Sequence, residues 1–253
     1  MEKADKKVAN LVVLAAGSAA AEAVGEWHNK VSQQSLPDDL EIKICTLTDR
    51  IDVLQLELSS LLAKADLIFV ACGVDAGALS SLLLQQSKKS GLTPVVLLSR
   101  DAALTLGDLG LLQDKVSVIR SDTTLAIMID KLLEPLVSEP FVRVDVDEFK
   151  SIVTPGSEGF LAVTVSSGDD ASFDTTEQAL IVCRNAMAEK QGSANIMVRL
   201  TGKEATFSFG DYIRAGEAVD AFSSDTSKVL VSTSCSKELS EGSYEAVVTF
   251  MKA

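Results

Sequence analysis

The chain has 253 residues, of which 47% are hydrophobic, and its 23 basic and 36 acidic residues give a net charge of −13. This length can bury one large core or two ordinary ones and favours two domains only weakly. The excess of carboxylates repels nucleic-acid phosphates and anionic membrane surfaces, so we expect direct binding to neither. No signal segment opens the chain, and no apolar run approaches the roughly 20 residues that cross a bilayer. We therefore expect a cytoplasmic protein.

The four cysteines, Cys45, Cys72, Cys183 and Cys235, lie far apart in the sequence, and the only histidine is His28. A metal site of the usual ligand spacing is therefore not expected. Buried free thiols in a reducing cytosol are the simpler interpretation. One histidine with no evident orienting partner also gives no indication of a Ser/His/Asp triad.

Residues 1–138 have the pattern of a doubly wound α/β domain. The predicted strands are residues 10–16, 41–47, 66–72, 93–98 and 116–119, and helices are expected at 19–31, in the segment that ends at 64, at 76–90, around 104–112 and at 123–137. Near-continuous apolar strands indicate a sheet covered on both faces. Strands that alternate with helices predict a mainly parallel sheet.

In residues 139–253 strands and helices alternate less strictly, which indicates a smaller α+β domain docked on the first. Residues 141–146 alternate between apolar and polar side chains, as a strand does. Further strands are expected at 160–165, 195–201, 228–234 and 244–250, with helices at 175–189 and 211–222. The short polar connection between the last two strands favours a hairpin.

Several segments, taken in order, resemble FtsZ, the bacterial tubulin homologue. Residues 65–73 (ADLIFVACG) are similar to the family's Ala-Asp strand that ends in Ala-Ala-Gly, and residues 143–153 (RVDVDEFKSIV) to its acidic loop. Residues 15–24 resemble the family's first glycine run, and residues 47–49 resemble its Asn-Thr-Asp segment. Residues 221–226 resemble part of its C-terminal domain. The resemblance implies an FtsZ/tubulin-like nucleotide-binding domain followed by the family's C-terminal domain.

The phosphate loop of that family is rebuilt in this chain. A phosphate loop needs bare backbone N–H groups that converge on the anion. The family's Gly-Gly-Gly-Thr-Gly-Thr-Gly corresponds to residues 75–81 (DAGALSS), which keep Gly77 but bring in Leu79 and the carboxylate of Asp75. At about 4 Å and an effective dielectric near 20, that carboxylate would cost a bound phosphate roughly 4 kcal/mol, or about three decades of affinity. We expect tight triphosphate binding to fail.

The rest of the expected pocket is also degenerate. Gly17 remains, whereas residues 18–21 replace glycines, so this stretch is expected to form an ordinary strand-to-helix connection. The rim of the former nucleotide pocket would consist of Gly17, Ser18, Gly73, Asp75 and Gly77.

The acidic loop is partly kept. Asp145 and Glu148 occupy the two acidic positions that in FtsZ filaments help to activate water on a neighbouring subunit's nucleotide, whereas Arg143 replaces the family's asparagine. Two interpretations stay open. Asp145, Asp147 or Glu148 can cap a helix and interact with its dipole, or these three residues can form a retained contact surface.

The preferred hypothesis is a protein without enzymatic activity that uses an FtsZ-like fold to bind FtsZ, FtsZ-like subunits or itself, in cell division or filament regulation. It would need no cofactor. A first alternative is a divergent GTPase that polymerises, contacts GTP and Mg²⁺ through Gly17, Ser18, Gly73 and Gly77, and acts on a neighbour's nucleotide with the acidic loop. A second is a module that binds a small anion. The family's C-terminal linker and membrane-tether peptide are missing here, so direct membrane anchoring is not expected.

Overall fold

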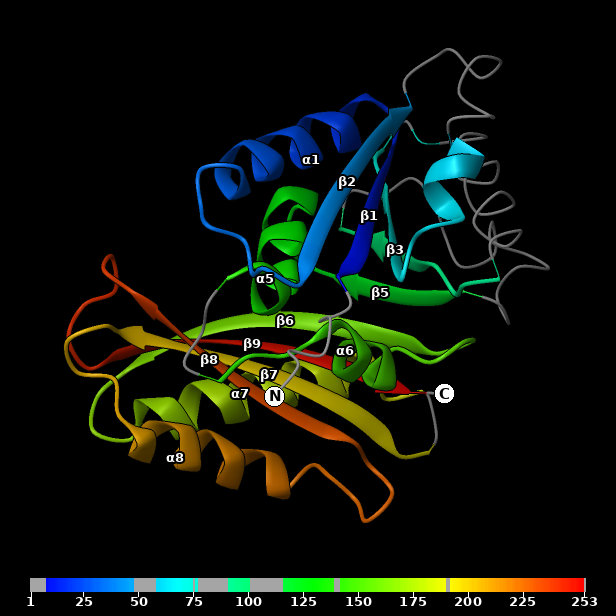
Figure 1. Cartoon of the computed structure of the whole chain (residues 1–253). Helices are drawn as coiled ribbons and strands as arrows, with labels where there is room; N and C mark the ends of the chain where they lie inside the picture. The colour runs from blue at the N-terminus through cyan, green and yellow to red at the C-terminus, as the bar shows by residue number, and fades with distance from the viewer. Residues whose placement is uncertain are drawn as a thin grey trace, which may run out of the picture.

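The computed structural model of this chain describes residues 8–47, 58–74, 76, 91–100, 116–138, 142–189 and 192–252. Asp75, Gly77 and most of the helices expected at 76–90 and 104–112 lie outside these residues. Element numbers follow Figure 1, where α1 is followed by α5.

The first half forms the parallel strands expected of it. They are β1 (Ala9–Ala16), β2 (Leu40–Leu47), β3 (Leu67–Cys72), β4 (Val95–Leu98) and β5 (Ser117–Ser121), and the labelled helices are α1 (Ser18–Val31) and α5 (Leu125–Val137). All six residues of β3 and all four of β4 are buried, because the sheet is covered on both faces. Helices α1 and α5 lie on one face, and a helical turn at residues 58–62 packs on the other (Figure 1).

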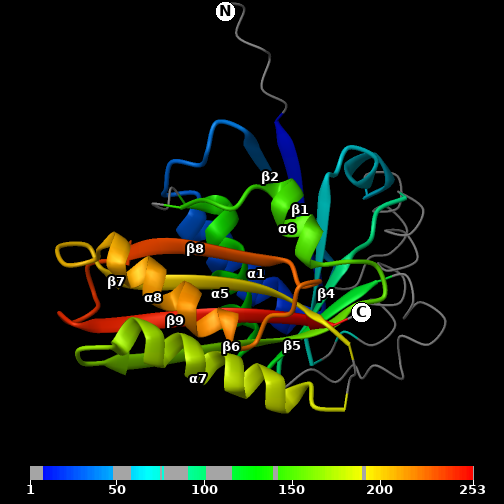
Figure 2. The same cartoon turned by 90° about the horizontal axis from the view of Figure 1, so that it is seen from below.

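Within the described residues, the second half adds four strands and three helices. In chain order they are α6 (Val146–Ile152), β6 (Glu158–Ser167), α7 (Ala171–Ala186), β7 (Ala194–Lys203), α8 (Phe209–Asp220), β8 (Val229–Ser236) and β9 (Ser243–Lys252). Helices α7 and α8 lie side by side and cover one face of these strands, as Figure 2 shows from below.

The strands of the described residues form one mixed sheet of nine, in the order β2-β1-β3-β4-β5-β6-β9-β7-β8. Strands β1 to β5 pair in parallel, and β6 continues this pattern through the pairs Val118↔Glu158 to Ser121↔Leu161. Strand β9 runs antiparallel to both β6 and β7, whereas β8 is parallel to β7. The expected α/β class with a mainly parallel first half is confirmed.

Two expectations for the second half are wrong. The last two strands form no hairpin, because β7 lies between β8 and β9. Residues 141–146 do not form a strand either: in the part that the structure describes, Val142 makes one isolated bridge to Thr233, and α6 begins at Val146. The alternation there results from buried Val144 and Val146 flanking a helix cap at Asp145.

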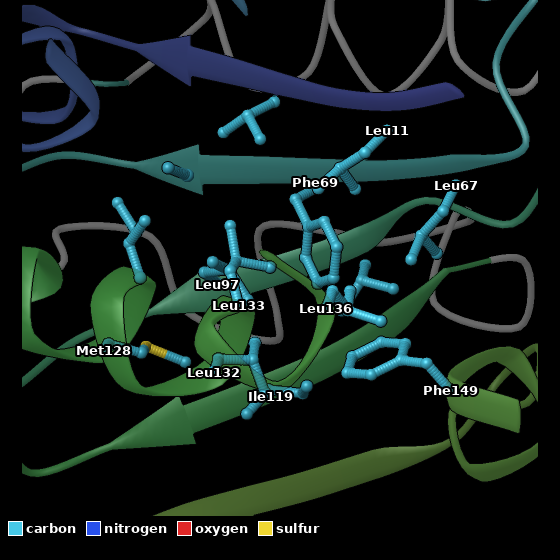
Figure 3. Close-up of a cluster of buried hydrophobic side chains, with 14 of the residues drawn as sticks. Leu11, Leu67, Phe69, Leu97, Ile119, Met128, Leu132, Leu133, Leu136 and Phe149 are labelled. Atoms are coloured by element: carbon cyan, nitrogen blue, oxygen red, sulfur yellow. The ribbon is translucent and has the colours of Figure 1, made fainter. Parts of the chain in front are cut away.

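One hydrophobic core joins the two halves. Helix α5 packs between the first-half sheet and the inner face of the second-half strands, so Leu161, Met197 and Val247 share a cluster with first-half residues. Within this cluster the rings of Phe69 on β3 and Phe149 on α6 meet edge to face, with their centroids 5.5 Å apart (Figure 3). Such a ring pair adds about 1 kcal/mol to the area that it buries.

Candidate functional site

The parallel strands end together at one edge of the sheet. The pairs Ala16↔Cys72 and Cys72↔Leu98 place the carboxyl ends of β1, β3 and β4 in line. In open α/β sheets, ligands bind in the crevice outside these ends. We refer to this side of the molecule as the carboxyl edge, and the described rim residues expected from the sequence, Gly17, Ser18 and Gly73, belong to it.

Gly17 makes the turn from β1 into α1. Its φ of 89° is in a region that side chains other than glycine rarely adopt, which explains why a glycine stands here. Its carbonyl accepts the N–H of Ala21 at 3.0 Å, and no side chain caps the helix that begins at Ser18. A strand-to-helix connection made with small residues therefore stands here, and the loss of phosphate binding by this loop stays a prediction.

Gly73 follows β3, and its backbone is engaged within the protein. Its N–H donates to the carbonyl of Ala16 at 3.0 Å, and its own carbonyl accepts the N–H of Ala76 at 3.1 Å. A phosphate-binding loop needs N–H groups that point at the anion, and the N–H of Gly73 is already used. The predictions for Asp75 and Gly77 lie outside the described residues.

A cleft of about 270 Å³ opens at the carboxyl edge, between the first half of α1 and the start of α5. Its lining is made of small or apolar residues, two hydroxyls and two carboxylates: Ala19, Glu22, Ala23, Glu26, Gly73, Val74, Ser99, Thr124, Leu125 and Ala126. The described lining includes no lysine or arginine, so Glu22 and Glu26 give it a negative charge. At its rim, Val74 is 52% exposed, and the neighbouring Ile127 is 44% exposed.

The described lining of this cleft differs from that of a phosphate site. Two carboxylates repel a polyphosphate, and among the described lining residues only the hydroxyls of Ser99 and Thr124 offer side-chain hydrogen-bond donors. The sequence interpretation missed both glutamates. The signal was available, because residues 22 and 26 are four apart on a helix and therefore share a face with Ala19 and Ala23.

The acidic loop forms a helix cap. The N–H of Glu148 donates to Asp145 Oδ1 at 2.8 Å, and the N–H of Asp145 donates to Glu148 Oε2 at 2.9 Å, which together make a capping box at the start of α6. Asp147 lies between them, points to solvent and pairs with Lys150 at 3.0 Å. The capping interpretation thus has its hydrogen bonds in the structure, whereas the contact-surface interpretation stays a prediction.

The acidic loop and the cleft lie at opposite ends of the parallel strands. A hollow of about 160 Å³ beside the loop is lined by Ala9, Asp39, Asp66, Arg143, Asp145, Val146 and Asp147. Ala9 begins β1, while Asp39 and Asp66 directly precede β2 and β3, so this is the amino edge of the sheet. Arg143 pairs with Asp39 at 2.7 Å. The two predicted groups of site residues therefore cannot act together within one molecule.

A buried charge network lies away from both edges, where α5 meets β7 and β9. Arg199 is 2% exposed; its Nη2 lies 3.0 Å from Glu245 Oε1, and it also pairs with Glu134. Lys131 reaches the same oxygen of Glu245 at 2.5 Å. Burial lowers the pKa of the Arg199 guanidinium, an effect that Glu245 and Asp130 oppose. Sequence patterns missed this network because its members are far apart in the chain.

The network borders a large hollow between the two halves. A cavity of about 810 Å³ opens between α1, α5 and the end of β8, beside a second of about 320 Å³ that Arg199 lines. Lysines and carboxylates from both halves alternate around them. Because Arg199, Lys131, Lys30 and their carboxylates are paired with one another, we assign the network a structural role.

The cysteines differ from one another in exposure. None of the four forms a disulfide; Cys72 and Cys183 are buried, Cys45 is half-buried and Cys235 is exposed. The expectation of buried thiols is therefore wrong for Cys235, which lies near the end of β8 at the rim of the large hollow. Burial raises the pKa of Cys72 to about 12 and also raises that of Cys183.

The described part of the chain has neither a metal-binding cluster nor a membrane-spanning helix. No group of three or more His, Cys, Asp or Glu side chains there is arranged to hold a metal ion. Within the same residues, no helix combines the length and the apolar character that a membrane crossing requires.

Comparison with known proteins identifies the fold. Neither a protein-family model nor a curated protein sequence matches the chain. Among solved structures, an FtsZ dimer from M. jannaschii has a TM-score of 0.72 at 11% identity, over 98% of this chain and 89% of that one. CetZ from Methanosaeta thermophila has a TM-score of 0.60 at 14% identity, over 96% and 86%.

TubZ from Bacillus thuringiensis serovar israelensis, solved as GDP-form protofilaments, has a TM-score of 0.57 at 11% identity, over 95% of this chain and 84% of that one. Three differently named members of the FtsZ/tubulin superfamily thus match almost the whole chain. The protein has the FtsZ/tubulin fold, as the sequence resemblance implies.

Proposed function

We propose that this protein is a non-hydrolysing FtsZ-like protein that acts through protein–protein contacts, as a cap or regulator of FtsZ-like filaments in the cytoplasm. The observation that carries the proposal is the cleft at the carboxyl edge. It stands where an FtsZ-type fold would bind a nucleotide, yet its described lining carries Glu22 and Glu26 and no basic residue.

The engaged backbone of Gly73 supports the same proposal. Its N–H donates to the carbonyl of Ala16, and alanines at the start of α1 stand where the FtsZ family has a glycine run. Nucleotide binding depends on such bare loops, whereas a subunit contact depends on the shape of a whole face. A fold that keeps its shape over almost the full length of M. jannaschii FtsZ while its pocket has changed fits an interaction role.

The acidic residues of this loop have a structural role that does not depend on nucleotide hydrolysis. Asp145 and Glu148 both contribute to the capping box, and this bonding stabilises α6 whether or not a nucleotide is near. Their retention is therefore compatible with a protein that performs no chemistry.

Two measurements test the proposal. When the protein is mixed with assembling FtsZ, we expect shorter filaments and less sedimented polymer at substoichiometric amounts. Unchanged filament length and sedimentation would count against a role in filament regulation. Bovine serum albumin at the same concentration controls for crowding.

Titration with a fluorescent GTP analogue in the presence of Mg²⁺ separates this function from a divergent GTPase. We expect no submicromolar binding, because two carboxylates line the cleft. Submicromolar binding would favour the GTPase instead, and M. jannaschii FtsZ titrated alongside shows that the assay detects a nucleotide site. Titration with inorganic phosphate tests the small-anion module in the same way.

A further inference from the structure

The outer face of α8 carries an exposed apolar stripe. Helix α8 lies on the outer surface of the second half, on the side away from α1 (Figure 1), and its inner side buries Ala215, Ala218 and Val219. On the opposite side, Phe209 is 60% exposed and Ile213, one turn later, is 46% exposed. Side chains four residues apart lie on the same face of a helix, so these two apolar residues form one patch.

The Phe209 ring is held in a fixed position on this face. It stacks on the ring of Tyr212, with the ring centroids 5.5 Å apart and the planes 20° from parallel. An exposed aromatic ring that is already ordered loses little conformational freedom when a partner covers it, and such rings serve as anchors in protein interfaces. The stripe therefore has a rigid knob at its amino end.

Gly216 leaves a gap on the same face. It lies about two turns after Phe209, and a Cβ at this position would meet no heavy atom within 4 Å. No tight contact in the described part of the chain therefore requires a glycine here, although glycine makes the interior of a helix less stable than alanine does. A glycine on the outside of a helix lets another surface approach the backbone closely.

Phe209 and Gly216 make the stripe complementary to itself. The midpoint between them falls between Tyr212 and Ile213, so a twofold axis there places each Phe209 over the Gly216 of an antiparallel second copy. Twofold contacts are self-complementary in this way, because residue i of one copy meets residue j of the other and the reverse. The knob and the gap thus match each other across a helix pair, with Ile213 of both copies near the axis.

The charges on α8 favour the antiparallel arrangement over the parallel one. Glu217 already pairs with Arg214, whereas Asp220 is exposed at the carboxyl end of the helix. In a parallel pair Asp220 would face its own copy. In an antiparallel pair it lies near the partner's amino end, which is the positive end of the helix dipole.

We propose that a second copy of this chain docks on the outer face of α8, antiparallel, with Phe209 of each copy over Gly216 of the other. The helix has 12 residues, a length of about 18 Å. A pair of this length buries less than the roughly 800 Å² per partner of a standard interface, so the dimer is weak, with a Kd on the order of 10–100 µM. The contact goes beyond the proposed function, because it uses neither the cleft nor the acidic loop.

Sedimentation velocity of the protein alone, from about 1 µM to about 1 mM, tests the contact. We expect the wild type to form dimers in this range at high salt, because salt screens the net charge of −13 on each copy and does not weaken apolar contacts. Phe209→Glu should stay monomeric, whereas Val165→Glu, at a 57% exposed apolar residue on β6, should dimerise like the wild type. A monomeric wild type, or equal dimerisation of the two variants, would overturn the proposal.

Gly216 gives a second test that a loss of folding cannot imitate. Gly216→Leu fills the gap, so we expect dimerisation to weaken about tenfold or more, while Tm stays the same or rises because leucine is the better helix former. Gly25→Leu is the matched control, since a Cβ there also meets no heavy atom within 4 Å, but no large apolar side chain lies one turn away on its face. This control should dimerise like the wild type.

Exchange of the knob and the gap tests the register. Phe209→Ala removes the knob, and the double variant Phe209→Ala/Gly216→Leu supplies a new knob at residue 216 opposite a new gap at residue 209. We expect the double variant to dimerise more strongly than either single variant, and circular dichroism melting checks that all three fold. A double variant no stronger than the single variants, or a Gly216→Leu variant that dimerises like the wild type, would overturn the antiparallel pairing.

Discussion

Asp145 and Glu148 bind each other's backbone, since each side chain accepts the N–H of the other residue, at 2.8 and 2.9 Å. This reciprocal pair fixes where α6 begins, and α6 carries Phe149 into the core against Phe69. The two acidic residues that most resemble a catalytic loop in the sequence therefore have a direct role in stability.

Replacement of Asp145 should destabilise the protein even in the absence of any nucleotide. Asp145→Ala removes the acceptor for the N–H of Glu148, and we expect it to lower the free energy of unfolding by about 1 kcal/mol. For a chain of this size, this lowers Tm by about 2–4 °C. Urea unfolding followed by circular dichroism measures the change.

Asp147→Ala is the matched control for this cap. Asp147 has the same charge and lies two residues away, but it makes a solvent-exposed pair with Lys150, which contributes about 0.5 kcal/mol or less. Equal stability of Asp145→Ala and the wild type would show that the cap contributes nothing, and would leave the contact-surface interpretation as the better account of this loop.

The sequence predicted the first half of the fold well because its signals are local. Continuous apolar runs such as residues 66–72 mark buried parallel strands, and Gly17 marks the end of one. The second half was harder. A short polar connection favours a hairpin, but the position of β7 between β8 and β9 depends on contacts between distant segments.

The error at residues 141–146 was avoidable. Asp145 and Glu148 have the three-residue spacing of a capping box just before buried Phe149, which is a helix-start signal. The capping interpretation already used this signal, but the alternation of Val142, Val144 and Val146 favoured a strand over the same residues. The carboxylates of the cleft were missed for another reason: only the packing of α1 beside α5 shows that Glu22 and Glu26 face a groove.

The buried network around Arg199 should be necessary for stability. Arg199→Met leaves the largely buried carboxylate of Glu245 with Lys131 alone and removes a partner of Glu134, so we expect a loss of about 3 kcal/mol in the free energy of unfolding. Urea unfolding monitored by the fluorescence of Trp27 measures this loss.

Two further variants test whether charge is the cause. Arg199→Met/Glu134→Gln removes the carboxylate that Arg199→Met leaves without its described partner, and should recover about 1 kcal/mol relative to Arg199→Met. Lys43→Met breaks an exposed pair with Glu41, 3.3 Å long, and should change stability by less than about 0.5 kcal/mol. If Arg199→Met cost as little as Lys43→Met, the network would have no stabilising role.

Alkaline pH should weaken the fold through Cys72. Burial raises the pKa of this thiol to about 12 from the ordinary value of 9.0, so the folded state keeps the proton that the unfolded state releases. The contribution to stability is fully present below pH 9 and is lost as pH rises from 9 toward 12; at pH 10 the loss is about 1.4 kcal/mol.

Comparison with Cys72→Ala isolates this contribution. We expect the free energy of unfolding of the wild type to fall between pH 8 and pH 10 by about 1.4 kcal/mol more than that of the variant. Cys235→Ala, at an exposed thiol whose pKa is also raised by desolvation and by Glu204, should follow the wild type more closely than Cys72→Ala does. Parallel pH dependence of the wild type and Cys72→Ala would contradict the effect of burial on this thiol.

Two glycines should respond to alanine with opposite signs. Gly159 on β6 stands opposite Met251 on β9, and a Cβ there would overlap the Met251 side chain and lie 2.7 Å from the carbonyl oxygen of Phe250. Met251 is 1% exposed and the oxygen is backbone, so neither can move away without a cost. Gly159→Ala should therefore lose about 1–3 kcal/mol.

Gly25 lies in the interior of α1, where a Cβ would meet no heavy atom within 4 Å. Gly25→Ala should stabilise the protein by about 0.5–1 kcal/mol, because alanine loses less backbone entropy in a helix. Parallel urea titrations of the two variants check both signs with the same chemical change. A stabilising Gly159→Ala would contradict the close packing of β6 on β9, and a destabilising Gly25→Ala would contradict the open face of α1.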